Sequence, residues 1–327
     1  MSVKAIFQAA KVEDACSPYD TIHLKVFYPA QMLGSSPEQN MGVFPADAQQ
    51  SPFKVVIFFN GINCGIESYQ WLAIKLAERG LVVVTFSWIA QNIPGIVAIT
   101  PGVEMKSLTP KVYGTKPTAS ALPTLLAALE RLQSEGVLAG LLDLQHIILG
   151  GHSAGGRVAI ESANPHFFPQ VVAAFSYGAH SAAIMQLGYA ADTILPLPDA
   201  LPLMLIGGTG DGVIANNGAL YGVTWKQPTT PIRRTFQEAI SGGRDDSYLL
   251  LLEGANHFSI THPSDPTTGT TWLDFPVTQP EELLRNLIVE AIGLFIDAHV
   301  RFHPTALANL NQLMESHQPG IASFESK

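Results

Sequence analysis

The feature that most constrains the fold of this chain is a glycine-rich turn between two regular segments. Residues 147–149 are apolar and typical of a strand, Gly151-His152-Ser153-Ala154-Gly155 follows at once, and residues 157–161 are compatible with a helix. A strand that turns directly into a helix leaves no space for side chains beside the turn, which explains the glycines on either side of the serine. The residue at the tip is then held in a strained backbone conformation. We therefore predict that Ser153 presents its hydroxyl at the end of a strand, as a nucleophile.

Apolar runs alternate with amphipathic segments along most of the chain. Almost continuously apolar runs, as expected of strands covered on both faces, occur at residues 53–59, 81–86, 171–177, 201–206 and 248–252. Apolar residues recur at helical spacing in residues 69–77, 120–135 and 284–295. Two further strands are expected at residues 3–9 and 21–28. The alternation from about residue 53 to residue 300 predicts an α/β fold, with a mostly parallel central sheet and helices on both faces.

The chain shows no internal repeat and no boundary of a second domain. We expect one domain over residues 1–303 and a C-terminal tail of weak periodicity over residues 304–327. Two irregular insertions, about residues 89–119 and 214–246, follow the carboxyl ends of strands, the edge where open α/β sheets bind ligands. The first insertion carries several apolar residues among prolines and glycines: Ile93, Ile96, Val97, Ile99 and Val103. It forms either an apolar cap over the serine or a loop that packs only on its own body.

The composition limits the partners that this chain can bind. Charged residues make up only 14% of the sequence, and the net charge is −9. This charge argues against nucleic acids and anionic membrane surfaces as partners. The sequence has neither a secretory signal nor an apolar run long enough to span a membrane, so we expect a cytoplasmic protein without an integral membrane segment. Cys16 and Cys64 are interpreted as isolated thiols, and a disulfide between them is the alternative.

A serine hydroxyl becomes nucleophilic when a base takes its proton, and an acid must orient that base. His257 follows the apolar run 248–252 in a loop of small residues, from which it can reach the serine. Asp211 follows the preceding apolar run, which places the three residues in the chain order serine, acid, histidine. A turn aspartate is the alternative interpretation of Asp211. The weaker candidates are His262 as the base and Asp192, Asp199 and Asp246 as the acid.

Acyl transfer also needs backbone N–H groups that stabilise the developing oxyanion. One is expected from Ala154, the residue after the nucleophile, and the other from Ile62, in the loop after residues 53–59. Cys64 in that loop has no base placed for it by any motif, so we interpret it as a small loop residue. The glycines around Asp211 match neither G-x-G-x-x-G nor a Walker motif. We expect neither a cofactor nor a metal.

These residues resemble the α/β-hydrolase superfamily, over about residues 53–259 and again in the last helix. Within it the chain is most similar to the group of bacterial cutinase-like polyester hydrolases, chlorophyllases, platelet-activating-factor acetylhydrolases and dienelactone-hydrolase-like proteins. The resemblance lies in residues 56–62, 71–84 and 151–156. It implies the triad Ser153, Asp211 and His257, with Ile62 and Ala154 as oxyanion donors.

Three departures from the family pattern bear on the substrate. Asn60-Gly61 stands where His-Gly is common, Ser153 stands where dienelactone hydrolases have cysteine, and Ala154 stands where chlorophyllases usually have arginine. We expect a serine carboxylester hydrolase that acts through an acyl-enzyme on a hydrophobic ester, lipid-like or bulky. A thioesterase, amidase or acyltransferase would use the same triad. The alternative of another class is a non-catalytic relative that binds an apolar ligand or a partner protein.

Overall fold

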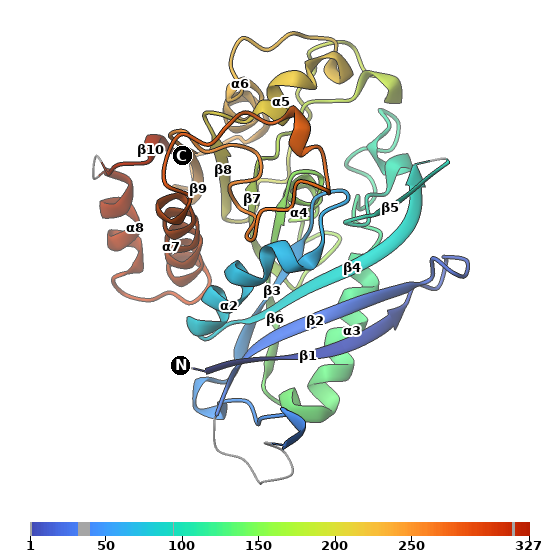
Figure 1. Ribbon diagram of the computed structural model, residues 1–327, viewed down its shortest axis with the longest axis vertical. Helices are drawn as coiled ribbons and strands as arrows, with labels where there is room; N and C mark the ends of the chain where they lie inside the picture. Colours follow the sequence, from blue (N-terminus) through green and yellow to red (C-terminus); the bar gives the residue numbers. More distant parts are fainter. Residues whose placement is uncertain (1, 32–39, 94, 316–317) are drawn as a thin grey trace.

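The computed structural model of the 327-residue chain describes residues 2–31, 40–93, 95–315 and 318–327 (Figure 1). Over these residues the strands are β1 (Ser2–Lys11), β2 (Thr21–Ala30), β3 (Phe53–Phe59), β4 (Val82–Ile93), β5 (Ile96–Ile99), β6 (Leu142–His152), β7 (Val171–Tyr177), β8 (Leu203–Gly208), β9 (Ser247–Leu252) and β10 (Ile321–Ser326). The α-helices are α2 (Gln70–Glu78), α3 (Leu122–Ser134), α4 (Ala154–Glu161), α5 (Gly212–Asn216), α6 (Thr230–Arg234), α7 (Glu281–His299) and α8 (Ala306–Glu315).

The strands form one sheet in the order β1-β2-β4-β3-β6-β7-β8-β9-β10, and β5 pairs with β4. Strands that are neighbours in this order run parallel from β4 through β9. The pairs β1–β2, β2–β4, β4–β5 and β9–β10 are antiparallel. The predicted mostly parallel central sheet is confirmed. A parallel arrangement brings the carboxyl ends of β3, β6, β7, β8 and β9 to the same edge.

Helices cover both faces of the sheet because side chains along each central strand alternate between two apolar clusters. In β3, Val55, Ile57 and Phe59 pack with α3 and α4 on one face. Val56 and Phe58 pack with α2 and α7 on the other. All five side chains are buried. Continuous apolar character in the sequence therefore reflects burial on two sides, as predicted.

The segment 304–327 differs from the tail expected from the sequence. It contains α8, which packs beside α7, and β10, which pairs antiparallel with β9 at the edge of the sheet (Figure 1). Helix α8 buries a single stripe of residues, Ala306, Leu310 and Met314. The side chains of β10 are mostly half-buried, as is common for an edge strand. The apolar patterns of α8 and β10 are too short or too weak to predict either element from the sequence. These elements are stabilised by the surfaces of α7 and β9 instead.

The first insertion, residues 89–119, begins as regular structure rather than as a loop. Strand β4 continues to Ile93 and turns back into β5, and the chain then returns through a bridge between Val103 and Ala119. The side chain of Ile93 lies outside the described residues. The second insertion, residues 214–246, includes most of α5 and all of α6. No helix of the described residues combines the length and apolar character needed to cross a membrane.

Candidate active site

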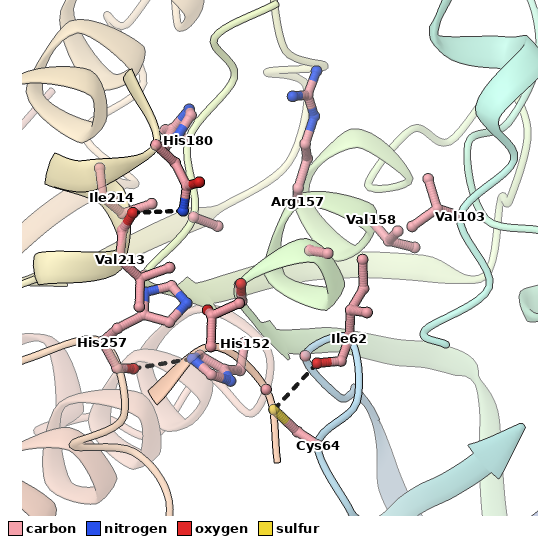
Figure 2. Close-up of a pocket in the computed structure, with 18 of the residues that line it drawn as sticks. Ile62, Cys64, Val103, His152, Arg157, Val158, His180, Val213, Ile214 and His257 are labelled. Atoms are coloured by element: carbon pink, nitrogen blue, oxygen red, sulfur yellow. Dashed lines mark hydrogen bonds between the residues drawn. The ribbon is translucent and has the colours of Figure 1, made fainter. Parts of the chain in front are cut away.

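A cavity of about 420 Å³ opens at the carboxyl edge of the parallel sheet (Figure 2). Loops that follow five of the parallel strands contribute to its wall. Their lining residues include Ile62 after β3, Ser153 after β6, His180 after β7, Val213 after β8 and His257 after β9. Four of the five predicted site residues therefore line one cavity: Ile62, Ser153, Ala154 and His257. Asp211 is not among the lining residues.

Ser153 lies at the turn between β6 and α4, with φ +56° and ψ −125°. This is a strained conformation for a residue with a side chain, and such strain concentrates at functional sites. A Cβ on Gly151 would lie 2.4 Å from the carbonyl oxygen of Gly155, and a Cβ on Gly155 would lie 2.3 Å from the carbonyl oxygen of Asn60. The predicted need for glycine at both positions is confirmed.

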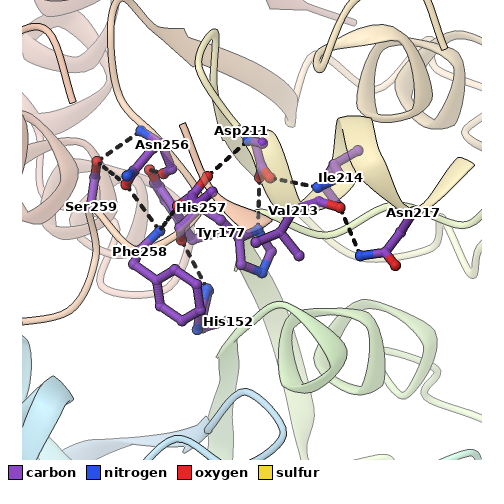
Figure 3. A network of polar contacts seen from close by, with 12 residues as sticks. His152, Tyr177, Asp211, Val213, Ile214, Asn217, Asn256, His257, Phe258 and Ser259 are labelled. Atoms are coloured by element: carbon purple, nitrogen blue, oxygen red, sulfur yellow. Dashed lines mark hydrogen bonds and ion pairs between the residues drawn. The ribbon is translucent and has the colours of Figure 1, made fainter. Parts of the chain in front are cut away.

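The predicted base and acid form a buried hydrogen bond (Figure 3). His257 Nδ1–H donates to Asp211 Oδ2 over 2.8 Å. The side chains of His257 and Asp211 are only 2% and 4% exposed. Burial alone would lower the pKa of His257, but the charge and hydrogen bond of Asp211 outweigh it, so that pKa is raised above 6.5. Since Nδ1 carries the proton of this bond, Nε2 of the neutral ring is the nitrogen that can accept one.

Asp211 also acts as a turn aspartate, which was its alternative interpretation from the sequence. Its Oδ1 accepts the backbone N–H of Ile214 over 2.8 Å and caps the first turn of α5. One carboxylate oxygen thus holds the turn and the other holds His257. Among the described residues no hydrogen bond joins Ser153 to His257, although both line the cavity. Catalytic hydrogen bonds of this kind are often long in enzymes without substrate.

His152, which precedes the serine, connects the loops on both sides of it. Its Nε2–H donates to the carbonyl oxygen of His257 over 3.0 Å, and its Nδ1 accepts the hydroxyl of Tyr69 over 2.8 Å. The Tyr69 oxygen in turn accepts the N–H of Gly61 over 3.1 Å. Burial holds the pKa of His152 well below 6.5, so the ring is neutral. The hydrogen bonds of His152 could not be predicted from the sequence. Position 152 is variable in the turn motif, and its partners lie far away in the chain.

A second carboxylate, Asp274, stabilises the loops of the predicted acid and base. It accepts the N–H of Gly212 over 2.8 Å and the N–H of Phe258 over 3.2 Å. Burial, followed by the nearby charge of Asp211, raises the pKa of Asp274. The charge of Asp274 also contributes to the raised pKa of His257. No periodic pattern surrounds Asp274 in the sequence, so no signal there could have identified it.

The two predicted oxyanion donors come from two different segments, the start of α4 and the loop after β3. Ala154 is the first residue of α4, where a backbone N–H has no acceptor within the helix. Ile62 belongs to a loop that is fixed at Asn63: its N–H donates to the carbonyl oxygen of Ile99 over 2.8 Å, and its side-chain oxygen accepts the N–H of Ile99 over 3.1 Å. Strand β5 therefore supports the loop that carries one of the donors.

The weaker candidates of the sequence analysis do not reach this arrangement. His262 is exposed and is not among the residues lining the cavity. Asp192 pairs with Arg234, Asp246 pairs with Arg244, and Asp199 accepts the N–H of Ser241. Both cysteines are free thiols, Cys16 exposed and Cys64 buried. Burial raises the pKa of Cys64, which disfavours its thiolate.

Both insertions line the cavity, but not with all the residues expected. The first contributes Val103, Met105 and Leu108, and the second contributes Ile214, Asn217, Leu220 and Tyr221. Ile96 and Val97 of β5 are about half exposed and are not among the lining residues, so this part of the apolar run does not form the cavity wall. Among the described strands, β5 pairs only with β4.

A scan against protein-family models finds no match, and a search of curated proteins finds none either. Within the described part of the chain, no group of three or more histidine, cysteine or acidic side chains is arranged to hold a metal ion.

Proposed function

We propose that this protein is a serine carboxylester hydrolase of the α/β-hydrolase superfamily. One observation carries the proposal: His257, which forms a buried hydrogen-bonded pair with Asp211, lines the same cavity as a serine held in a strained turn between a buried strand and a helix. The His–acid pair and the turn serine come from three different strand ends. Such a combination is what activation of a hydroxyl requires, and neither half alone would support it.

In the proposed reaction, Ser153 Oγ attacks the ester carbonyl carbon while His257 Nε2 takes the hydroxyl proton. The Asp211 carboxylate holds Nδ1–H and stabilises the imidazolium that forms. The N–H groups of Ile62 and Ala154 stabilise the oxyanion. His257 then donates the proton to the leaving alcohol, which leaves an acyl-enzyme. A water deprotonated by His257 cleaves the acyl-enzyme by the same steps and returns the proton to Ser153.

The cavity wall favours hydrophobic esters. Apolar side chains from both insertions and from α4 surround the space next to the serine, including Val103, Met105, Val158, Ile214 and Leu220. A volume of about 420 Å³ lies within the usual range of small-molecule sites. We therefore expect esters with an extended apolar group to react faster than acetates.

A fluorophosphonate probe tests the proposal directly, because it reacts with an activated serine. We expect the probe to label the wild-type protein and to fail on Ser153→Ala, with hydrolysis of p-nitrophenyl butanoate reduced at least a thousandfold. Ser134→Ala, at an exposed position of α3, is the matched control and keeps both activities. An unlabelled wild-type protein would instead favour the non-catalytic alternative. If thioesters react faster than matched oxygen esters, or if added alcohols capture the acyl group, the reaction is thioester hydrolysis or acyl transfer.

A further inference from the structure

Helix α4 presents one face to the cavity along its whole length. Ala154, Arg157, Val158 and Glu161 all line the cavity, at the spacing of a single helical face. Ala154 and Glu161 are seven positions apart, which is about 10 Å along the helix axis. The cavity thus extends from Ser153 at the start of α4 to a charged pair at its end. Figure 2 shows the Arg157 side chain extending from α4 away from His152 and Cys64.

The charged pair is buried and only partly satisfied. Arg157 Nε donates to Glu161 Oε1 over 2.8 Å, and the two side chains are 12% and 2% exposed. Arg157 Nη1 donates to the carbonyl oxygen of Ala182 over 2.7 Å. These contacts use two of the five N–H groups of a guanidinium. A buried ion pair is weak evidence for stability, since apolar residues in its place are often as stable. Its position in the wall of an apolar cavity therefore points to binding.

Two polar groups close to these lining residues, but not themselves among them, lack hydrogen-bond partners among the described residues. The Tyr189 hydroxyl is buried, has no hydrogen bond, and lies close enough to Arg157 and Glu161 for their charges to affect its pKa. The indole N–H of Trp225 is also buried without a partner, and its ring packs against His180 and Tyr221 of the cavity wall. Buried polar groups are normally hydrogen-bonded, so each of these two groups has a hydrogen bond to offer to a water or to a bound ligand.

His180 adds a donor to the same region. Its Nδ1 accepts the N–H of Ala182 over 3.2 Å. Burial, followed by the charge of Arg157, lowers the pKa of His180 to about 3, so the ring is neutral. The proton of the neutral ring is therefore on Nε2, which makes this atom a hydrogen-bond donor. Arg157 and His180 thus offer N–H groups to the cavity that they line, and Tyr189 carries a hydroxyl close to Arg157.

We propose that these groups form a polar subsite for an uncharged oxygen acceptor, a carbonyl, ether or hydroxyl oxygen, carried by the substrate about 10 Å from the scissile ester. Glu161 already neutralises Arg157, so a carboxylate would be repelled where a neutral oxygen is bound. The inference rests on the proposed ester hydrolase function and narrows its substrates. They are bifunctional esters, such as diesters or oxygenated acyl esters, rather than plain hydrocarbon esters.

The test compares two p-nitrophenyl esters with the same number of chain atoms, the decanoate and the ester of monomethyl suberate. A second pair carries the same groups on the alcohol side of an acetate. We expect the ratio of kcat/KM, oxygenated over hydrocarbon, to favour the oxygenated ester about tenfold to a hundredfold in one of the pairs, as a hydrogen bond to a charged group would. Equal rates in both pairs would overturn the proposal.

The variant Arg157→Met/Glu161→Met replaces the pair without leaving an unpaired charge. We expect it to abolish the preference, and because both rates come from one preparation, their ratio does not depend on the fraction of folded enzyme. Arg285→Met/Glu281→Met, a pair at the same spacing in α7, is the matched control and keeps the wild-type ratio. Tyr189→Phe removes one hydroxyl only and lowers the ratio by a smaller factor. A wild-type ratio in both Arg157→Met/Glu161→Met and Tyr189→Phe would refute the subsite.

A binding measurement separates this inference from the proposed reaction. Calorimetry with Ser153→Ala compares the affinities of the two matched esters without turnover. Tighter binding of the oxygenated ester supports the subsite even if the fluorophosphonate probe fails to label the wild-type protein. Equal affinities in both pairs count against the subsite even if hydrolysis is found.

Discussion

Replacing Asp211 by asparagine tests the electrostatic part of the site. The asparagine side chain keeps the shape of the aspartate and an oxygen for the Nδ1–H of His257, but it removes the negative charge. In the wild type, burial lowers the pKa of His257 while the charge and hydrogen bond of Asp211 raise it above 6.5. Without the carboxylate, burial becomes the dominant influence, and we expect the pKa of His257 to fall below its wild-type value.

The sign of the effect on activity follows from the role of His257 as the base. Only the neutral ring accepts the Ser153 proton, so kcat/KM is lost as the pH falls through the pKa of His257. The wild-type protein should lose activity below a midpoint above pH 6.5, and Asp211→Asn should lose it at a lower pH.

The rate itself should also fall. The His257–Asp211 hydrogen bond is 2.8 Å long and buried. A hydrogen bond to a charged group contributes roughly 1.5–3 kcal/mol, and each 1.36 kcal/mol is tenfold in rate. We therefore expect Asp211→Asn to reduce kcat/KM at its pH optimum by about ten- to a hundredfold or more.

The assay is hydrolysis of p-nitrophenyl butanoate from pH 5 to 9, with thermal unfolding measured in parallel. Asp199→Asn is the control, since that carboxylate contacts the loop at Ser241 rather than His257. If the midpoint of Asp211→Asn coincides with that of the wild type, the assignment of Asp211 as the partner that sets the pKa is refuted.

Three further predictions address the turn, the connecting histidine and the cavity wall. Gly155→Ala places a Cβ 2.3 Å from the Asn60 carbonyl oxygen, so we expect a loss of roughly 1–3 kcal/mol or more in urea unfolding, whereas Gly65→Ala meets only the movable Glu67 carboxylate and should change little. His152→Phe removes the donor to the His257 carbonyl oxygen and the acceptor for the Tyr69 hydroxyl proton, about 1–3 kcal/mol each, and should lower both the unfolding free energy and kcat. Unchanged values would show that the ring only fills space. Met105→Glu puts a charge in the apolar wall and should reduce kcat/KM for octanoate esters far more than for acetate esters, and equal losses would argue against an apolar group binding there.

The central part of the fold was predictable because its pattern is local. Strand β3 was expected at residues 53–59 and β7 at residues 171–177, and both have those bounds. A strand buried on two faces is continuously apolar, so its signal lies in its own residues. The segment from residue 304 was not predictable in this way, since α8 and β10 are stabilised by surfaces of α7 and β9.

The same distinction applies to the candidate site, because some of its residues could be predicted from the sequence and others could not. Ser153, Asp211 and His257 lie at or shortly after the ends of buried strands. Since the ends of parallel strands meet at one edge, their positions and order in the chain made them the leading candidates. A parallel sheet is enough to bring these three positions to the same edge. The sequence thus determined which residues could supply the chemistry.

The residues that hold and extend the site depended on the tertiary structure. His152 bonds to Tyr69, 83 positions earlier, and to His257, 105 positions later. Asp274 joins two loops that no sequence pattern connects, and the sequence identifies Arg157 only as part of a helix, without its burial against the cavity. Hydrogen bonds and burial between distant segments exist only after folding, because the partners are set by packing and not by spacing along the chain. The tertiary structure therefore decided how the candidate site is held and which other side chains line its cavity.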